Sequence, residues 1–373
     1  MVESTEPTAA VVRTFTEWDP LEEVIVGTVQ GAVYPEYGPI LAANGDPAWL
    51  EHYAGAFVEE ELVEHATEQL DTFVAILEGE GVVVRRPDPV PHHAGFSTPW
   101  WQSRSGWNSA NPRDLFLVVG DQIIECASPL RHRYFEAQAY RRVLRTYFRA
   151  GARWSAAPAP TLREPLYDYS ALAEPEAHRP RLLGADESHH YPITEHEPVF
   201  EAADFIRCGL DLFAIQSTVT NRSGIAWVER HLGESFRIHQ LQTRQSNPCH
   251  IDTTFIPLCP GVALVHPQWF TKAPPCLKDW TLLPAPPPEY HPESPMATPY
   301  FTSQWLSMNL FSLDSKRVFV DDQQQTLIRL LRQHHFEPIP IAFDAVGAFG
   351  GSFHCATLDI RRRGGLERYV ASP

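Results

Sequence analysis

The residues with the clearest potential for chemistry lie near the C-terminus, where Cys355 ends the run Phe349-Gly-Gly-Ser-Phe-His-Cys355. Glycines allow a backbone to approach a ligand closely, and a cysteine acts as a nucleophile when its neighbours favour the thiolate. A free cysteine is also commonly a small buried side chain with no chemical role. These residues alone therefore leave both catalysis and packing open for Cys355.

A histidine and an aspartate form a second candidate, His250 and Asp252, within the segment Asn247–Asp252. If this segment is a strand, both side chains lie on one face. A histidine beside an anionic binding group suits general acid–base catalysis. The alternative is a structural histidine next to a solvated aspartate.

Two further acids, Glu201 and Asp204, are flanked by the apolar pairs Val199-Phe200 and Phe205-Ile206. Acids placed so close to core residues need partners. They could hold a cation or make structural hydrogen bonds. The run Asn111-Pro-Arg-Asp114 precedes a predicted strand and is typical of a cap or a turn.

Histidine doublets raise the question of a metal site: His92-His93, His189-His190 and His334-His335. They are adjacent pairs rather than sets with ligand spacing. The sequence also has no glycine-rich loop of the Walker or dinucleotide-binding type. We therefore expect neither a metal ion nor a cofactor.

Alternating hydrophobic patterns predict the elements that position these residues. The predicted strands are Glu22–Thr28, Val82–Arg86, the hairpin Leu115–Val119 with Gln122–Cys126, Gly261–His266 and Arg317–Val320. The predicted helices are Glu59–Leu77, Arg133–Ala150, Gly224–Leu232 and Gln324–His335.

A weak repeat links Asp114-Leu-Phe-Leu with Asp211-Leu-Phe-Ala, each expected to begin a strand that a helix follows. The strands near 261–265 and 309–313 resemble further copies. Hairpins that alternate with single helices predict several small β/α units in one closed array. The proline-rich stretches Pro87–Pro99, Pro158–Pro165 and Ala273–Pro299 are expected to be surface excursions from this array.

Composition limits the class of protein. The chain has 373 residues, of which 43% are hydrophobic and 34 are proline, which favours a large core with many loops over a helical bundle. Its net charge of −16 argues against nucleic-acid binding and favours cationic small molecules. We expect no signal peptide and no transmembrane helix. Six cysteines without a CxxC pair are typical of a reducing cytoplasm.

Taken together, the motifs resemble those of the amidinotransferases, which include glycine amidinotransferase and the inosamine-phosphate amidinotransferase of streptomycin assembly. The resemblance extends from Trp18 to Arg363. It is carried by Glu17–Gly27, Asn111–Asp114, Tyr147-Phe148, Phe200–Phe205, His250–Asp252, Trp305–Asn309, Gly350–Cys355 and Cys355–Arg362.

The resemblance implies a pentein-type α/β-propeller of five ββαβ units, with an N-terminal tail at residues 1–15 and a single catalytic domain at residues 16–373. It implies that Cys355 is the nucleophile and His250 the proton-transfer residue. Asp114, Glu201 and Asp252 match carboxylates that surround the guanidinium. Further substrate contacts are expected at Asp204, Asn247, Cys249, Trp269, Thr302, Ser303 and Ser352.

The implied reaction is a ping-pong transfer of an amidino group from a guanidine donor, with L-arginine expected, to an amine acceptor in specialised metabolism. A planar guanidinium suits a grip by several carboxylates. A homodimer in the cytoplasm is expected, with no membrane or nucleic-acid partner. The alternatives are a guanidine hydrolase, which uses water as the acceptor, and a guanidine-binding protein without catalysis.

Three positions depart from the family pattern. Glu201 stands where the transferases usually have aspartate and related deiminases often have glutamate. Ser352 replaces a third glycine. Trp269 stands where the arginine-using members have an arginine that binds the donor's carboxylate, so either another cation such as Lys272 takes that role or the donor has no carboxylate.

Overall fold

The computed structural model describes residues 11–44, 46–172, 191–245, 247–300 and 302–371. Most of the predicted N-terminal tail and the His189-His190 doublet lie outside this part of the chain. In the described part, five three-stranded sheets repeat one pattern. The first two strands of each sheet are antiparallel, and the third strand is parallel to the second.

The first strands of the five units are β17 (Thr357–Arg362), β5 (Phe116–Val119), β8 (Phe205–Cys208), β11 (Phe255–Cys259) and β14 (Phe311–Ser312). The second strands, in the same order, are β1 (Leu21–Val26), β6 (Gln122–Glu125), β9 (Asp211–Ala214), β12 (Val262–Val265) and β15 (Arg317–Asp321). The third strands are β2 (Val83–Arg85), β7 (Arg153–Ala156), β10 (Arg237–Gln240), β13 (Thr281–Pro284) and β16 (Glu337–Ile341).

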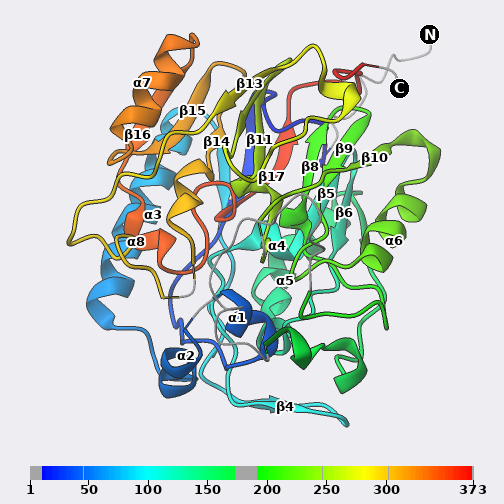
Figure 1. Ribbon diagram of the computed structural model, residues 1–373, viewed down its shortest axis with the longest axis vertical. Helices are drawn as coiled ribbons and strands as arrows, with labels where there is room; N and C mark the ends of the chain where they lie inside the picture. The colour runs from blue at the N-terminus through cyan, green and yellow to red at the C-terminus, as the bar shows by residue number, and fades with distance from the viewer. Residues whose placement is uncertain (1–10, 45, 173–190, 246, 301, 372–373) are drawn as a thin grey trace, which may run out of the picture.

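A helix precedes the third strand in four units: α3 (Glu60–Gly79), α5 (Arg141–Arg149), α6 (Arg222–Leu232) and α7 (Gln325–Gln333). Figure 1 shows α3, α6 and α7 on the outside of the molecule, with β8, β11 and β17 nearer its centre. Between β12 and β13 a 3₁₀ turn, Pro275–Leu277, takes the place of the helix. Prolines 267, 274 and 275 disfavour a longer helix there, because proline lacks the N–H that a helix interior needs.

The remaining elements lie outside the five units. They are the short helices α1 (Pro39–Asn44), α2 (Pro47–Tyr53), α4 (Pro112–Leu115) and α8 (Asp344–Gly347), and the hairpin of β3 (Phe96–Ser97) with β4 (Gln102–Ser103). No helix in the described residues has the length and hydrophobicity that a membrane span needs.

The first and second strands of each sheet are buried on both faces, which explains why most of them are nearly continuous apolar runs, whereas the third strands are partly exposed. In β5, Phe116 and Val118 pack with β1 and β17, whereas Leu117 and Val119 pack with β8 and β9. The other units repeat this alternation, so each of five hydrophobic clusters lies between two neighbouring units. The ring of clusters closes between β14–β15 and β1. This closed ring confirms the predicted five-unit array.

Most predicted strands and helices are confirmed within a few residues, but the helix Arg133–Ala150 is wrong in its first half. Residues Arg131–Arg133 and Glu136–Tyr140 form 3₁₀ turns, and the α-helix begins at Arg141. Tyr134 packs against Trp101, in a different cluster from Tyr140 and the buried face of α5. The apparent helical spacing therefore joined residues of two separate packing surfaces.

The predicted repeat also matched different parts of its units. Asp114 lies in α4, just before a first strand, whereas Asp211 begins β9, a second strand. Likewise Ala273–Pro299 is more than a surface excursion, because it contains β13 with the buried Leu283. The repeated units therefore exist, but Asp114 and Asp211 do not occupy equivalent positions in them.

Short turns precede the first strands, and these turns position the site. They are α4 before β5, Ala202–Asp204 before β8, Ile251–Thr253 before β11 and Gln304–Met308 before β14. The turn before β8 contacts those before β5 and β11, and the turn before β11 contacts that before β14. Side chains from distant parts of the sequence therefore meet at one end of the first strands.

Candidate active site

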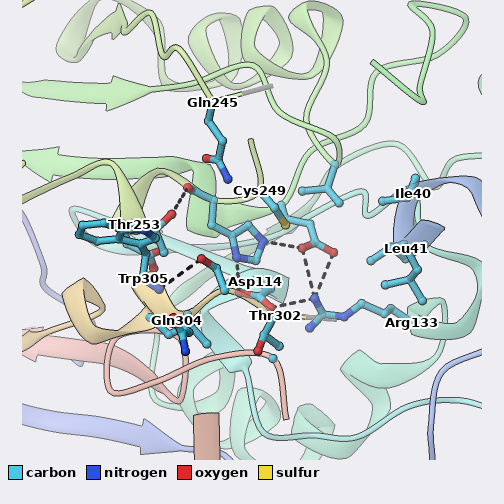
Figure 2. A pocket seen from close by; sticks show the side chains of 18 of the residues that line it. Ile40, Leu41, Asp114, Arg133, Gln245, Cys249, Thr253, Thr302, Gln304 and Trp305 are labelled. Carbon is cyan, nitrogen blue, oxygen red and sulfur yellow. Dashed lines mark hydrogen bonds and ion pairs between the residues drawn. The ribbon is translucent and has the colours of Figure 1, made fainter. Parts of the chain in front are cut away.

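A cavity of about 370 Å³ lies where these turns meet. Its lining includes Asp114 in α4 and Asp252 in the turn before β11. It also includes Glu201 and His250, which directly precede the turns before β8 and β11. Figure 2 shows Asp114 between an aliphatic side with Ile40 and Leu41 and an opposite side with Thr253 and Trp305. Of the other residues predicted to bind substrate, the lining includes Cys249, Trp269, Thr302 and Ser303.

Cys355 is fully buried and lies just before β17, close to the lining residues. Asn309 holds it at two points: its Nδ2 lies 3.2 Å from Cys355 Sγ, and its Oδ1 accepts the Cys355 backbone N–H at 3.1 Å. Ligand-type atoms of Asp114, His250 and Cys355 all lie within 4.8 Å of one another. The structure therefore brings together the predicted nucleophile, proton-transfer residue and one carboxylate.

Burial, with the Asp252 and Asp114 carboxylates, raises the pKa of the Cys355 thiol well above its usual range. The thiol lies 3.5 Å from Asp252 Oδ2. In the empty site the neutral thiol is therefore favoured. A cation that neutralises these carboxylates would favour the thiolate.

His250 is held in an unusual backbone conformation, with φ at +66°. Its Nε2 lies 2.8 Å from Glu201 Oε2, and its Nδ1 lies 3.7 Å from Asp114 Oδ1. Burial by itself would lower the pKa of His250, but the Asp114 carboxylate together with Cys249, Cys355 and Glu201 outweighs burial and raises this pKa well above its usual range. The expectation that a strand places His250 and Asp252 on one face is wrong, because a 3₁₀ turn starts directly after His250.

Both oxygens of Glu201 are engaged within the protein. Oε1 accepts from Ser128 at 2.6 Å and from Arg133 at 3.1 Å, and Oε2 faces His250. Although burial opposes ionisation, Arg133 and His250 lower the pKa of Glu201 to about 2. This arrangement favours a role in which Glu201 positions and charges His250, instead of contacting a guanidinium directly as the sequence suggested.

Asp114 and Asp252 each have one hydrogen-bonded oxygen and one without a hydrogen bond, although Asp114 Oδ1 lies 3.7 Å from His250 Nδ1. Asp114 Oδ2 accepts from Arg133 at 2.8 Å, and Asp252 Oδ2 lies 2.8 Å from His354 Nδ1. The Oδ1 atoms of both residues are buried and have no hydrogen-bond partner among the described residues. Leaving a buried acceptor unpaired is costly. Two such acceptors in one acidic cavity suit a planar cation with several N–H donors.

Arg133 is the main residue that the sequence analysis missed. Its Nε and Nη2 donate to Glu136, and its Nη1 donates to Asp114 and Glu201. Its guanidinium also lies 5.2 Å from the ring centre of Trp107. The sequence signal was the Arg133/Glu136 pair, which the predicted amphipathic helix concealed. Asn309 was also missed as a site residue, although it ends one of the matched motifs.

Three predicted contacts are not brought into the cavity. Asp204 is fully buried, and its Oδ2 accepts from the hydroxyl groups of Ser217 and Thr220. Asn247 and Ser352 are not among the residues that line the cavity. Asp204 therefore makes the structural hydrogen bonds that the sequence left open for it.

The glycines before Cys355 serve packing. A Cβ on Gly351 would lie 2.4 Å from Cys355 Cβ and from Asn111 Oδ1. Gly350 has φ at +96°, and a Cβ there would lie 2.7 Å from Trp107. These glycines therefore admit neighbouring protein atoms, and Gly350 also lines the cavity, in line with the expected close approach to a ligand.

The donor types of Asp114, His250 and Cys355 would also suit a divalent metal ion such as zinc. Asp114 is already paired with Arg133, whose positive charge lies beside the same carboxylate. A metal ion here would face that fixed positive charge, which opposes its binding. The cluster therefore suits acid–base and nucleophilic chemistry better than metal binding.

Behind this site cluster (Asp114, Glu201, His250, Asp252 and Cys355) lies a second group of buried charges. We call it the arginine network, formed by Glu17, Arg113, Arg207, Asp359 and Arg362. His354 joins the two, since its Nδ1 faces Asp252 and its Nε2 lies 3.3 Å from Glu17. The orientation of Asp252 thus depends on a chain of contacts into the core.

No family model matches the chain. It is 42% identical over 363 residues to the L-arginine:L-lysine amidinotransferase of Pseudomonas savastanoi pv. phaseolicola, covering 96% of each chain. Among solved structures it is similar to SxtG, an amidinotransferase of the saxitoxin biosynthetic pathway from Microseira wollei, with 44% identity and a TM-score of 0.89 over 96% of this chain and 99% of that one. It is also similar to the inosamine-phosphate amidinotransferase of Streptomyces griseus, with 33% identity and a TM-score of 0.82 over 96% and 99% of the two chains.

These relatives match nearly the whole chain, and they agree with the motif resemblance and with the ring of five units. The fold is therefore the pentein fold, and the chain belongs to the amidinotransferase family.

Proposed function

We propose that this amidinotransferase moves the amidino group of a guanidine donor to an amine acceptor through a covalent bond to Cys355. The observation that carries the proposal is the pair of unpaired oxygens on Asp114 and Asp252, which lie beside the Cys355 thiol. A bound guanidinium would satisfy both oxygens. Its charge would also lower the pKa of Cys355, so that the thiolate forms when the donor is present.

In the first half-reaction the Cys355 sulfur attacks the central carbon of the guanidinium. The bond from that carbon to the donor's amine nitrogen breaks, and His250 gives its proton to the departing amine. The amidino group remains on sulfur. In the second half-reaction the acceptor amine attacks the same carbon, His250 takes its proton, and the carbon–sulfur bond breaks to restore the thiolate.

Glu201 and Arg133 support this proton transfer from behind His250. The Glu201 carboxylate stabilises the imidazolium form, which is the form that protonates the leaving amine. Arg133 fixes Glu201 and Asp114 relative to each other through a single nitrogen, Nη1. Asp114, which would bind the donor, and Glu201, which orients His250, are thus both held by the guanidinium of Arg133.

The test is to incubate the enzyme with a guanidine donor alone and to map modified peptides by mass spectrometry. We expect one amidino group per chain on Cys355, and none after Cys355→Ala. Cys249 provides an internal control, because it lines the cavity but lies outside the cluster that Cys355 forms with Asp114 and His250. An unmodified Cys355 in an enzyme that still turns over would refute the covalent route.

The same incubation separates the alternatives. A guanidine hydrolase, which Glu201 favours as a departure from the usual aspartate, would turn over the donor repeatedly and release a urea-type product. A transferase stops at one adduct until an amine is added. A guanidine-binding protein without catalysis would form no adduct.

The wider setting is also part of the proposal. A role in specialised metabolism is supported by the similarity to SxtG, which acts in the saxitoxin biosynthetic pathway. We propose that residues 16–373 form a single catalytic domain, that the enzyme acts in the cytoplasm as a homodimer, and that it has no nucleic-acid or membrane partner. The donor and acceptor are small molecules, a guanidine and an amine.

A further inference from the structure

The cations of the cavity are already committed to acids of the protein. Among the described residues that line it, Arg133 and His250 are the basic ones. Every nitrogen of the Arg133 guanidinium donates to Glu136, Asp114 or Glu201. His250 faces Glu201 and Asp114. Neither residue is available to hold a carboxylate brought in by a substrate.

The wall formed by Trp269 carries no charge. The Trp269 indole stacks on His266 with ring centres 3.6 Å apart and planes 5° apart, and Trp305 lies 3.9 Å from the same imidazole. Burial lowers the pKa of His266 to about 4, so this histidine is neutral at pH 7. Its Nδ1 accepts the backbone N–H groups of Gln268 and Trp269. The wall is therefore made of three neutral rings, of which Trp269 and His266 are stacked and Trp305 is tilted against them.

Basic residues close in sequence do not supply the missing charge. Lys272 is exposed and is not among the lining residues, so the sequence-based alternative that it replaces an arginine is not supported. Arg244 contacts Trp269 through its backbone N–H, at 3.0 Å from the Trp269 carbonyl, but its exposed side chain is also absent from the lining. Arg131 lies over Trp101 and Tyr167 and pairs with Glu164.

Among the described residues that line the cavity, none offers a carboxylate an uncommitted cation, so a carboxylate there would lose water without gaining one, which is costly. It would also lie in the field of Asp114, Asp252 and Glu201, which repels it. The neutral donors of Thr302, Ser303 and Gln304 could bond to a carboxylate but could not offset that repulsion. An alkyl chain or an ammonium group meets no such penalty, since aromatic faces attract both.

We infer that the donor is an alkylguanidine without a carboxylate, whose chain or amine end lies against the Trp269 wall. This inference rests on the proposed transfer through Cys355 and narrows it to one class of donor. It separates this chain from the Pseudomonas relative, whose name gives L-arginine as its donor.

The test compares three guanidines as donors: agmatine, arginine and methylguanidine. Agmatine is arginine without the carboxylate, and methylguanidine lacks the chain as well. The rate of amidino labelling of Cys355 is measured against donor concentration, without an acceptor. The compared quantity is the second-order rate constant of labelling. A value for agmatine at least as large as that for arginine supports the inference. Faster labelling by arginine overturns it, while leaving the covalent transfer intact.

Methylguanidine separates failure of the inference from failure of the proposed function. Its binding depends only on the contacts of Asp114 and Asp252 with the guanidinium, and its reaction only on Cys355. Even slow labelling by methylguanidine would therefore show that Cys355 reacts with guanidines. If none of the three donors labels Cys355, transfer through this residue is refuted, and the inference about the donor falls with it.

A variant pair sharpens the comparison. Trp269→Arg places a cation at the neutral wall and should raise the arginine-to-agmatine ratio of kcat/KM by about tenfold or more, the scale of one charge-assisted hydrogen bond. Trp269→Phe keeps a neutral ring and should leave the ratio unchanged. Because each ratio compares two donors on one protein, partial loss of folded enzyme cancels. An unchanged ratio in Trp269→Arg would show that this wall does not face the donor.

Discussion

The arginine network and the site cluster are both buried and are joined by His354, yet they differ in how their acids are paired. In the arginine network, Asp359 pairs with Arg113, Arg207 and Arg362, and Glu17 pairs with Arg207. In the site cluster, the Oδ1 atoms of Asp114 and Asp252 have no hydrogen-bond partner among the described residues.

The pKa shifts of Asp359 and Asp114 show the same contrast, although His354 lowers the pKa of Asp252 against the opposing effect of burial. Although burial opposes ionisation, arginines lower the pKa of Asp359 far below its usual value. Burial instead raises the pKa of Asp114, which Arg133 and His250 offset only in part. Removing one partner from a buried ion pair destabilises the fold. A buried carboxylate oxygen without a partner instead carries a free-energy penalty, which a bound cationic substrate would remove. We therefore expect stability to depend on the first region and substrate turnover on the second.

The largest expected effect on stability is that of Asp359→Asn. It removes the charge shared by three buried arginines, and breaking a buried ion pair in this way costs about 3–5 kcal/mol of unfolding free energy. Chemical denaturation monitored by circular dichroism would measure the loss. A loss below about 1 kcal/mol would contradict the view that this network stabilises the fold.

An exposed ion pair gives the control for this experiment. Asp121 and Arg153 pair at 3.1 Å, but their side chains are 63% and 66% exposed. Asp121→Asn should therefore change the unfolding free energy by less than about 1 kcal/mol. The contrast between the two Asp→Asn variants isolates the contribution of burial.

In the site cluster, Asp252→Asn should reverse the pattern. It removes one of the two unpaired acceptors, so kcat/KM for the donor should fall by about 10²-fold or more, a loss of charge-assisted binding. The unfolding free energy should fall less than in Asp359→Asn, since the lost charge was only partly paired. Steady-state kinetics and denaturation on the same preparation provide both values.

Two outcomes would break the comparison between the regions. Near-normal kinetics with a large loss of stability would place Asp252 with the arginine network. A fall in kcat/KM accompanied by a large stability loss would show that His354 couples the two clusters too tightly to separate them.

A matching measurement on Asp114→Asn, whose carboxylate also pairs with Arg133, should show a larger stability loss than Asp252→Asn.

Patterns in the sequence were sufficient for the ring of units, because strands that are buried on both faces read as continuous apolar runs. The residue types alone left Cys355, His250 and Asp114 open between chemistry and structure, and it was the resemblance to the amidinotransferases that assigned them, with Asp252, to one site. Arg133 was hidden because its partners Glu201 and Asp114 lie 68 and 19 residues away. Local periodicity contains no information on such pairs.

The direction of side chains was the other feature that the sequence could not give. Glu201 and Asp204 look equivalent in a run of four residues, but a single 3₁₀ turn directs one toward His250 and the other toward Ser217 and Thr220. Of the glycines beside Cys355, Gly350 lines the cavity, but the sequence did not show that Asn111 and Trp107 pack against this segment. These distinctions depend on tertiary packing.

The smallest expected effect tests whether Glu201 keeps His250 in its protonated form. Glu201→Gln removes an anion that lies 2.8 Å from His250 Nε2, so the pKa of His250 should fall. Because the imidazolium protonates the leaving amine, the alkaline limb of the pH profile of kcat/KM should move to lower pH by about one unit. Glu201→Asp keeps the charge and should retain part of the wild-type profile. An unmoved limb in Glu201→Gln would assign Glu201 a purely structural role.

The pH dependence of stability gives an independent check with a defined sign. The pKa of Glu201 is lowered from 4.5 to about 2 in the fold, chiefly by Arg133 and His250 against the opposing effect of burial. Its charge therefore stabilises the folded state above pH 4.5, and this contribution is lost as the pH falls toward 2. The difference in unfolding free energy between wild type and Glu201→Gln should accordingly be largest near neutral pH and should narrow below it. A difference that stays constant over this window would show that the Glu201 charge does not contribute to folding, and that Ser128 and His250 accept the neutral amide equally well.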